Sequence, residues 1–158
     1  MKSPESFVLS PSEGMPNNPN HPVLIYRGAV KITGDVATTL EFLFGRNGWR
    51  AEWRDSIYSY HHYHSTAYEA LGVASGFGEV VLGGPSGRHV DVEAGDVLVL
   101  PPGTAHCLVS STEDLLVVGA YPEGQEWEAE RGPADFQTVK RINEVPAPRA
   151  DPVTGKPA

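Results

Sequence analysis

The stretch YHHYHSTAYE, residues 60–69, places three histidines, three tyrosines and one glutamate within ten positions. Side chains of an extended chain alternate between two faces, so His62 and His64 share one face, about 7 Å apart along the chain. Two imidazoles at this spacing can bind one ion. Glu69 follows across a short STA turn, and an antiparallel return of the chain would bring its carboxylate beside the pair. The stretch therefore predicts one half of a metal site.

A second stretch, GDVLVLPPGTAHC at residues 95–107, supplies another imidazole. We expect a strand to end at Leu100, a tight turn at the following PPG, and a new strand to open at His106. If that strand lies beside the first hairpin, three imidazoles and one carboxylate surround a single point. Such a set suits one divalent first-row transition metal, with Fe, Mn, Ni, Zn and Co as candidates. A five- or six-coordinate site would keep a position open for catalysis, whereas a closed tetrahedral site would be structural.

The rest of the chain has the pattern of an all-β domain. Its 17 glycines and 14 prolines separate short apolar runs, which predicts roughly ten strands at intervals of about 8–12 residues. We interpret ATTLEFLFG as one of these strands, because Leu40, Phe42 and Phe44 alternate with other residues. One short helix is expected near the C-terminal end, beginning at Pro133 and ending before Pro146.

The spacing of both stretches resembles the two sequence motifs of the cupin superfamily (RmlC-like). From Ser56 to Gly76 the chain has a small residue, five spacers, His-x-His, four spacers, Glu, six spacers and Gly. From Gly95 it has five spacers, Pro, one spacer, Gly, two spacers and His106. Ser56 and Ser110 depart from the Gly and Asn that the motifs usually have there, but neither position is a ligand in the family. The resemblance implies that one metal ion is held by four side chains: His62, His64, Glu69 and His106.

A narrower resemblance covers segments outside these motifs. This second resemblance is to the YjlB-type branch of small bacterial cupins, and it indicates no particular reaction. It is carried by four segments: MPNNPNHPVLIYRGAV, YHHYHSTAYEALGVASG, VVGAYPEGQEW and VPAPRADPVTG. The implied fold is all-β, a double-stranded β-helix (cupin jelly-roll barrel) with one short C-terminal helix. We expect an extended arm over residues 1–22, the barrel over 23–122, and the short helix with a Pro-rich tail over 123–158.

Side chains near the histidines are candidates for a ligand pocket. Tyr58 and Tyr60 share the parity of the histidine pair, so they either pack in the core with satisfied hydroxyls or face the open metal position. Tyr60 is the closer of the two and is the candidate for a proton donor. We expect Phe42, Phe44 and Val73 to form apolar pocket walls.

Charge and composition bear on partners and compartment. The formal net charge is −8, which argues against nucleic acid and an anionic membrane surface as partners. A single cysteine allows no intramolecular disulfide, and the first residues lack the apolar run of a signal peptide, so we expect a cytoplasmic protein. The arm before residue 23 would suit an edge strand covered by a second subunit, which predicts a homodimer.

Three functions stay open at this point. The first is a metalloenzyme acting on a small oxygen-rich or carboxylate-bearing metabolite, with oxygenase, decarboxylase and isomerase chemistry unresolved. The second is a binding module that holds a small-molecule ligand without turnover. The third is a barrel with a purely structural metal, although a chain of 158 residues is long enough to form a stable core without a metal or a disulfide.

Overall fold

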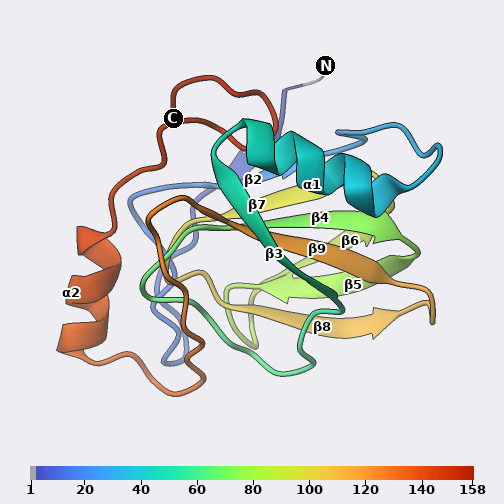
Figure 1. Ribbon diagram of the computed structural model, residues 1–158. Helices are drawn as coiled ribbons and strands as arrows, with labels where there is room; N and C mark the ends of the chain where they lie inside the picture. The colour runs from blue at the N-terminus through green and yellow to red at the C-terminus, as the bar shows by residue number, and fades with distance from the viewer. Residues whose placement is uncertain (1–2) are drawn as a thin grey trace.

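The computed structural model describes residues 3–158, which form nine strands and two helices (Figure 1). The strands are β1 (Glu5–Phe7), β2 (Val23–Tyr26), β3 (Trp49–Asp55), β4 (Glu69–Ser75), β5 (Phe77–Leu82), β6 (Arg88–Glu93), β7 (Val97–Leu100), β8 (His106–Ser111) and β9 (Leu116–Pro122). The helices are α1 (Val36–Arg46) and α2 (Phe136–Glu144). No helix within the described residues is long and apolar enough to cross a membrane.

The strands form two antiparallel sheets that pack face to face. One sheet has the order β1-β2-β7-β4-β9-β3 and the other the order β6-β5-β8. Leu71 and Val117 of the larger sheet meet Val80 of the smaller one in a shared apolar core. The arrangement confirms the predicted all-β class and the double-stranded β-helix, a jelly-roll barrel.

The segment ATTLEFLFG is helical, so its prediction as a strand is wrong. Asp35 caps the N-terminus of α1, where its carboxylate accepts a hydrogen bond from Thr38 N at 3.2 Å. Leu40 and Phe44 are buried one helical turn apart, whereas Phe42 is 70% exposed. The buried face of α1 covers the outer face of the six-stranded sheet (Figure 1). The alternation of Leu40, Phe42 and Phe44 fits only a strand, whereas the buried residues Leu40, Leu43 and Phe44 follow the helical spacing of three and four, and Asp35 supplies the N-cap.

The N-terminal arm is attached to its own barrel. Strand β1 pairs with β2 at the edge of the six-stranded sheet. Asn17 is buried; its amide donates to Gly83 O at 3.1 Å, and its Oδ1 accepts from Ala105 N at 3.0 Å. The arm therefore fixes the turn that precedes His106. The expected homodimer stays a prediction.

Helix α2 stands at one end of the barrel, as Figure 1 shows. The helix begins at Phe136 rather than at Pro133, because Asp135 caps it by accepting a hydrogen bond from Thr138 N at 2.8 Å, and it ends before Pro146, as expected. Ile142 is buried, whereas Phe136 is 78% exposed. Only part of the apolar surface of this helix is thus packed within the chain.

Candidate metal centre

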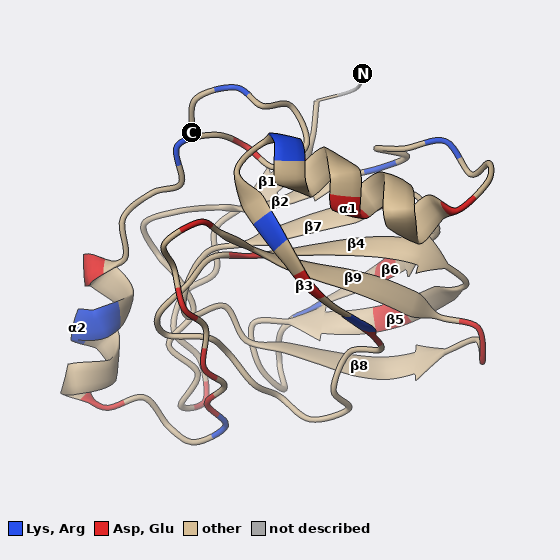
Figure 2. Cartoon of the chain, in the orientation of Figure 1, with Lys and Arg blue, Asp and Glu red and all other residues tan. Residues whose placement is uncertain are grey.

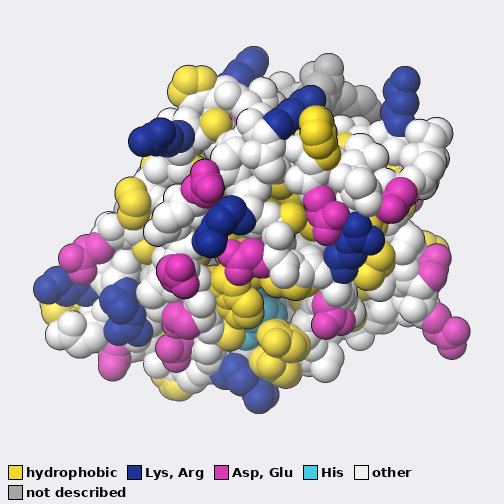
Figure 3. Space-filling view, viewed as in Figure 1, with side chains coloured by type: hydrophobic (Ala, Val, Ile, Leu, Met, Phe, Trp, Pro, Cys, Tyr) yellow, Lys and Arg dark blue, Asp and Glu magenta, His cyan; other side chains and the backbone are white. Residues whose placement is uncertain are grey.

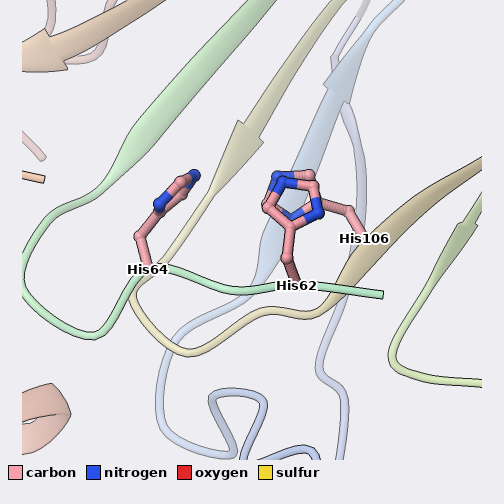
Figure 4. Close-up of side chains that lie close together, drawn as sticks. All are labelled: His62, His64 and His106. Carbon is pink, nitrogen blue, oxygen red and sulfur yellow. The ribbon is translucent and has the colours of Figure 1, made fainter. Parts of the chain in front are cut away.

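The two histidine-bearing stretches meet at one end of the barrel. His62 N donates to His106 O at 3.2 Å, and His106 N donates to His62 O at 2.9 Å, so the two residues form an isolated antiparallel bridge. His106 is the first residue of β8. Figure 4 shows the rings of His62 and His106 close together, with His64 beside them. Two motifs far apart in sequence therefore contribute to one site.

The three imidazoles form a compact and buried cluster. The candidate ligand nitrogens of His62, His64 and His106 all lie within 4.8 Å of one another. None of the three residues has more than 5% of its surface exposed. These separations let one ion reach all three nitrogens after small side-chain adjustments.

Each imidazole is oriented through its second nitrogen. Every Nδ1 atom lies within hydrogen-bond distance of a backbone carbonyl oxygen: that of Tyr60 for His62 (3.1 Å), that of Glu128 for His64 (2.5 Å) and that of Thr104 for His106 (3.0 Å). A carbonyl oxygen only accepts, so a neutral ring in this position carries its proton on Nδ1 and donates it. The lone pair of each Nε2 is then free to bind a metal. Metal-binding histidines have this tautomer and this kind of support.

Glu69, the first residue of β4, adds a buried carboxylate. Its Oε2 lies 3.1 Å from His64 Nε2, and its Oε1 lies 3.0 Å from His106 Nε2. Among the described residues, neither His64 Nε2 nor Glu69 Oε1 completes a directed hydrogen bond. Buried polar atoms are rarely left unsatisfied. Two of them beside the same point fit a metal ion bound there.

Burial and neighbouring charges set the protonation of the cluster. Burial lowers the pKa of His62 to about 3, and His106 adds to this effect. Burial also acts to lower the pKa of His64, but the Glu69 carboxylate outweighs it and raises this pKa to about 9. Burial acts to raise the pKa of Glu69, yet His64 and His106 hold it well below the usual range. Without a metal, the protonated His64 ring is the cation beside this ionised, buried carboxylate; a divalent metal bound there would displace the proton and supply the charge instead.

A cavity of about 270 Å³ opens onto the cluster. Besides the three histidines and Glu69, its walls are Trp53, Asp55, Ser56, Ile57, Tyr58, Leu71, Tyr121 and Trp127. Figure 3 shows a histidine surface in a hollow between hydrophobic side chains. The side of the cluster that faces the cavity is accessible to a small molecule.

Tyr58 and Tyr60 lie differently with respect to the cavity. Tyr58 lines the cavity, as expected. The ring of Tyr60 lies outside the lining, stacked on Tyr58 at 4.8 Å between centroids and covered by the Arg131 guanidinium at 3.7 Å. Its backbone carbonyl oxygen contacts His62 Nδ1. The Tyr60 ring also meets the His62 ring edge-on at 5.7 Å between centroids, and its role as a proton donor stays a prediction.

The three predicted apolar walls lie elsewhere. Phe42 faces away from the barrel on α1, and Phe44 is buried between α1 and the six-stranded sheet. Both expectations are wrong because they assumed a strand where the chain is helical. Val73 is buried in the core between the sheets and is not part of the cavity wall.

Comparison with known proteins agrees with this geometry. A family model described as "Cupin domain" matches residues 55–119, which include all four candidate ligands. The chain is also 36% identical over 149 residues to "Uncharacterized protein YjlB" of Bacillus subtilis (strain 168), covering 92% of this chain and 88% of that protein.

The chain belongs to the cupin superfamily. Solved structures similar to this cupin include an acireductone dioxygenase from Bacillus anthracis with a cadmium ion in its active centre, at 18% identity and a TM-score of 0.41. That match covers 63% of this chain and 76% of the dioxygenase. RmlC from Streptococcus suis in complex with dTDP-D-xylose matches at 12% identity and a TM-score of 0.38, covering 77% and 71% of the two chains. Likeness at this level carries no argument about ligand or reaction.

A segment after β9 completes the site of this cupin. Residues 126–132, here called the strap, run beside the histidine stretch, where Tyr63 and Glu130 exchange two backbone hydrogen bonds of 2.9 Å. The Glu128 carboxylate accepts from Ser65 N at 2.7 Å, and the Glu128 carbonyl contacts His64 Nδ1. Figure 2 shows acidic residues recurring along the chain between β9 and α2. The strap therefore sets the orientation of one candidate ligand.

Sequence reasoning missed Tyr121, Trp127 and Glu128, and it also missed the cavity walls Asp55, Ile57 and Leu71. Tyr121 OH donates to Glu69 Oε2 at 2.5 Å and accepts from Trp53 Nε1 at 2.8 Å. The ring of Trp127 stacks on that of Tyr121 at 5.3 Å between centroids. The sequence offered one signal for Tyr121 and Trp127, the segment VVGAYPEGQEW, which carries the narrower resemblance but says nothing of contacts; Glu128 lies just after it.

Proposed function

We propose that this cupin is a metal-dependent enzyme that acts on a small oxygen-bearing metabolite. The ligands would be His62, His64, His106 and Glu69. One observation carries the proposal: all three Nδ1 atoms are committed to backbone carbonyls, which leaves three Nε2 lone pairs and a carboxylate around one point on a cavity wall.

A divalent first-row metal held by these residues would supply a Lewis acid with positions open to substrate on the cavity side. The chain's own residues do the rest. The Tyr121 hydroxyl holds the Glu69 carboxylate in place. Ile57 and Leu71 present apolar wall to the cavity, which limits the water beside a bound substrate. The identity of the metal, among Fe, Mn, Ni, Zn and Co, stays open.

The location of the cluster favours catalysis over a structural role. A metal that only stabilises a fold has its coordination closed by protein ligands. Here the four candidate ligands line a cavity, and the barrel core of Leu71, Val80 and Val117 packs without them. Removal of metal with a chelator should therefore leave a folded protein with a cooperative melting transition. Loss of that transition would instead indicate a structural metal.

Turnover can be tested before the substrate is identified. Apoprotein reloaded separately with each candidate metal is incubated with a small-metabolite extract, and mass spectrometry follows the loss of individual compounds. We expect one metabolite to be consumed with one or two of the metals. The His62→Ala, His106→Ala double variant should lose both the metal and the consumption. Unchanged consumption by a metal-free variant would contradict the proposal.

A further inference from the structure

The cavity is aromatic on both sides of the histidine cluster. On one side Trp127 stacks on Tyr121 with 13° between the ring planes, and it meets the His64 ring edge-on at 5.5 Å. On the other side Tyr58 meets the His62 ring edge-on at 5.0 Å. Trp127 is 37% exposed and Tyr58 is 51% exposed, so both have ring surface free for a ligand. Aromatic rings favour flat partners that stack on them or meet their edges.

The charges at the cavity disfavour a second anionic group on the ligand. The charged side chains lining it, among the described residues, are the carboxylates of Asp55 and Glu69. Asp55 is exposed at the rim, while Glu52, which accepts from Trp127 Nε1 at 3.1 Å, is paired with Arg50 at 3.2 Å. A divalent metal bound to Glu69 and neutral imidazoles keeps one net positive charge. That charge can compensate an anionic chelating end, but an anionic outer end would face the Asp55 carboxylate.

The size of the cavity limits the ligand to a small molecule. Ligand sites in proteins commonly enclose about 300–1,000 Å³, and this cavity encloses about 270 Å³. A single ring, or an acyclic molecule of similar size, would fill it.

We infer that the ligand is a planar, π-bearing small molecule that chelates through two adjacent oxygens and carries no negative charge at its opposite end. This inference rests on the proposed function and narrows it, because it disfavours metabolites with a carboxylate remote from the metal. Trp127 and Tyr58 would contact the plane or edge of the ligand, and Asp55 would select against a remote anion.

Two probes with the same chelating end test whether the site disfavours a negative charge at the opposite end of the ligand. 4-Methylcatechol and 3,4-dihydroxybenzoate share a ring and two adjacent oxygens, and they differ only in a methyl group against a carboxylate. The protein is loaded with Zn²⁺, which has no redox chemistry of its own, and zinc content is measured before calorimetric titration. We expect 4-methylcatechol to bind at least about tenfold more tightly, equivalent to about 1.4 kcal/mol. Asp55→Asn should narrow this difference by strengthening the binding of 3,4-dihydroxybenzoate alone.

Variants and a third probe test the aromatic walls. Trp127→Ala should weaken 4-methylcatechol binding by about tenfold, as expected from the loss of one aromatic contact, while Phe42→Ala on the outer face of α1 should leave it unchanged. Lactate, which also chelates through adjacent oxygens but is not planar, should bind more weakly than 4-methylcatechol. Equal or tighter binding of lactate or 3,4-dihydroxybenzoate would overturn the inference.

Failure of the ligand inference and failure of the metal site give different results. If one equivalent of zinc binds but 4-methylcatechol does not, the inference about the ligand is wrong and the metal site stands. If zinc does not bind, the proposed function fails, and the inference fails with it.

Discussion

Tyr121 connects the candidate metal centre to the barrel wall through one hydroxyl. It donates to Glu69 Oε2 and accepts from Trp53 Nε1. Burial raises the pKa of Tyr121, and the Glu69 carboxylate raises it further. The phenol therefore stays protonated and acts as a donor that positions Glu69, rather than as a base.

Removal of this hydroxyl should weaken metal binding without unfolding the barrel. Residues that orient metal ligands typically contribute about 10–100-fold in affinity, so Tyr121→Phe should lower metal affinity by at least about tenfold. The matched control is Tyr68→Phe, because Tyr68 is also buried but packs in the cluster beneath α1. Competition with a chromogenic chelator measures both affinities. Equal metal affinities of the two variants would contradict a positioning role for Tyr121.

The four candidate ligands could be predicted from sequence, whereas Tyr121 could not. His62, His64 and Glu69 lie within eight positions, so alternation of side chains and one turn are enough to bring them together. His106 follows from its own motif. The contact between Tyr121 and Glu69 instead joins residues 52 positions apart on neighbouring strands, and only the register of the sheet determines it.

At the scale of elements, α1 shows that a short apolar pattern can be assigned to a strand where the chain forms a helix. Strand and helix make different predictions for Phe42 and Phe44: a strand places both on one face, whereas the helix buries Phe44 and exposes Phe42. Phe44→Ala should therefore destabilise the protein by about 3–5 kcal/mol. Phe42→Ala should change the free energy of unfolding by about 0.5 kcal/mol or less. Urea unfolding of both variants checks this, and similar losses would contradict the helix.

The turn before β8 is the second element on which the site depends. Gly103 has φ +91°, and a Cβ there would lie 2.6 Å from Asn17 O and 2.9 Å from Ile142 Cδ1. Gly103 N also donates to His64 O at 2.8 Å. This turn thus joins the arm, α2 and both histidine stretches, which the separate sequence motifs did not reveal.

A pair of glycine variants separates backbone strain from this close packing. Gly124 has φ +85° with open space around it, so Gly124→Ala should cost about 1–2 kcal/mol from the left-handed conformation alone. Gly103→Ala adds a clash with backbone and should lower both Tm and metal affinity further. Melting curves and chelator competition on the two variants give the comparison. Equal effects would mean that Asn17 and Ile142 impose no constraint on the turn.

At the scale of the whole molecule, the apolar residues that form the core and the polar residues of the candidate site occupy different parts of the barrel. The core between the sheets and the layer beneath α1 are two clusters of buried apolar side chains, while the polar cluster lies at one end of the barrel and faces a cavity. The jelly-roll class followed from the sequence, because glycine and proline punctuation and the two motifs are strong signals. The position of the strap beside the histidines did not, because it depends on long-range pairing such as that of Tyr63 with Glu130.

The most direct test of the central claim is elemental analysis of the purified, untagged protein after reconstitution. The comparison uses two double variants, each lacking two histidines: His62→Ala, His106→Ala in the cluster, and His21→Ala, His89→Ala outside it. We predict about one equivalent of a divalent first-row metal in the wild type and in the outer variant, and none in the cluster variant. Metal absent from the wild type, or retained equally by the cluster variant, would contradict the proposed metal centre.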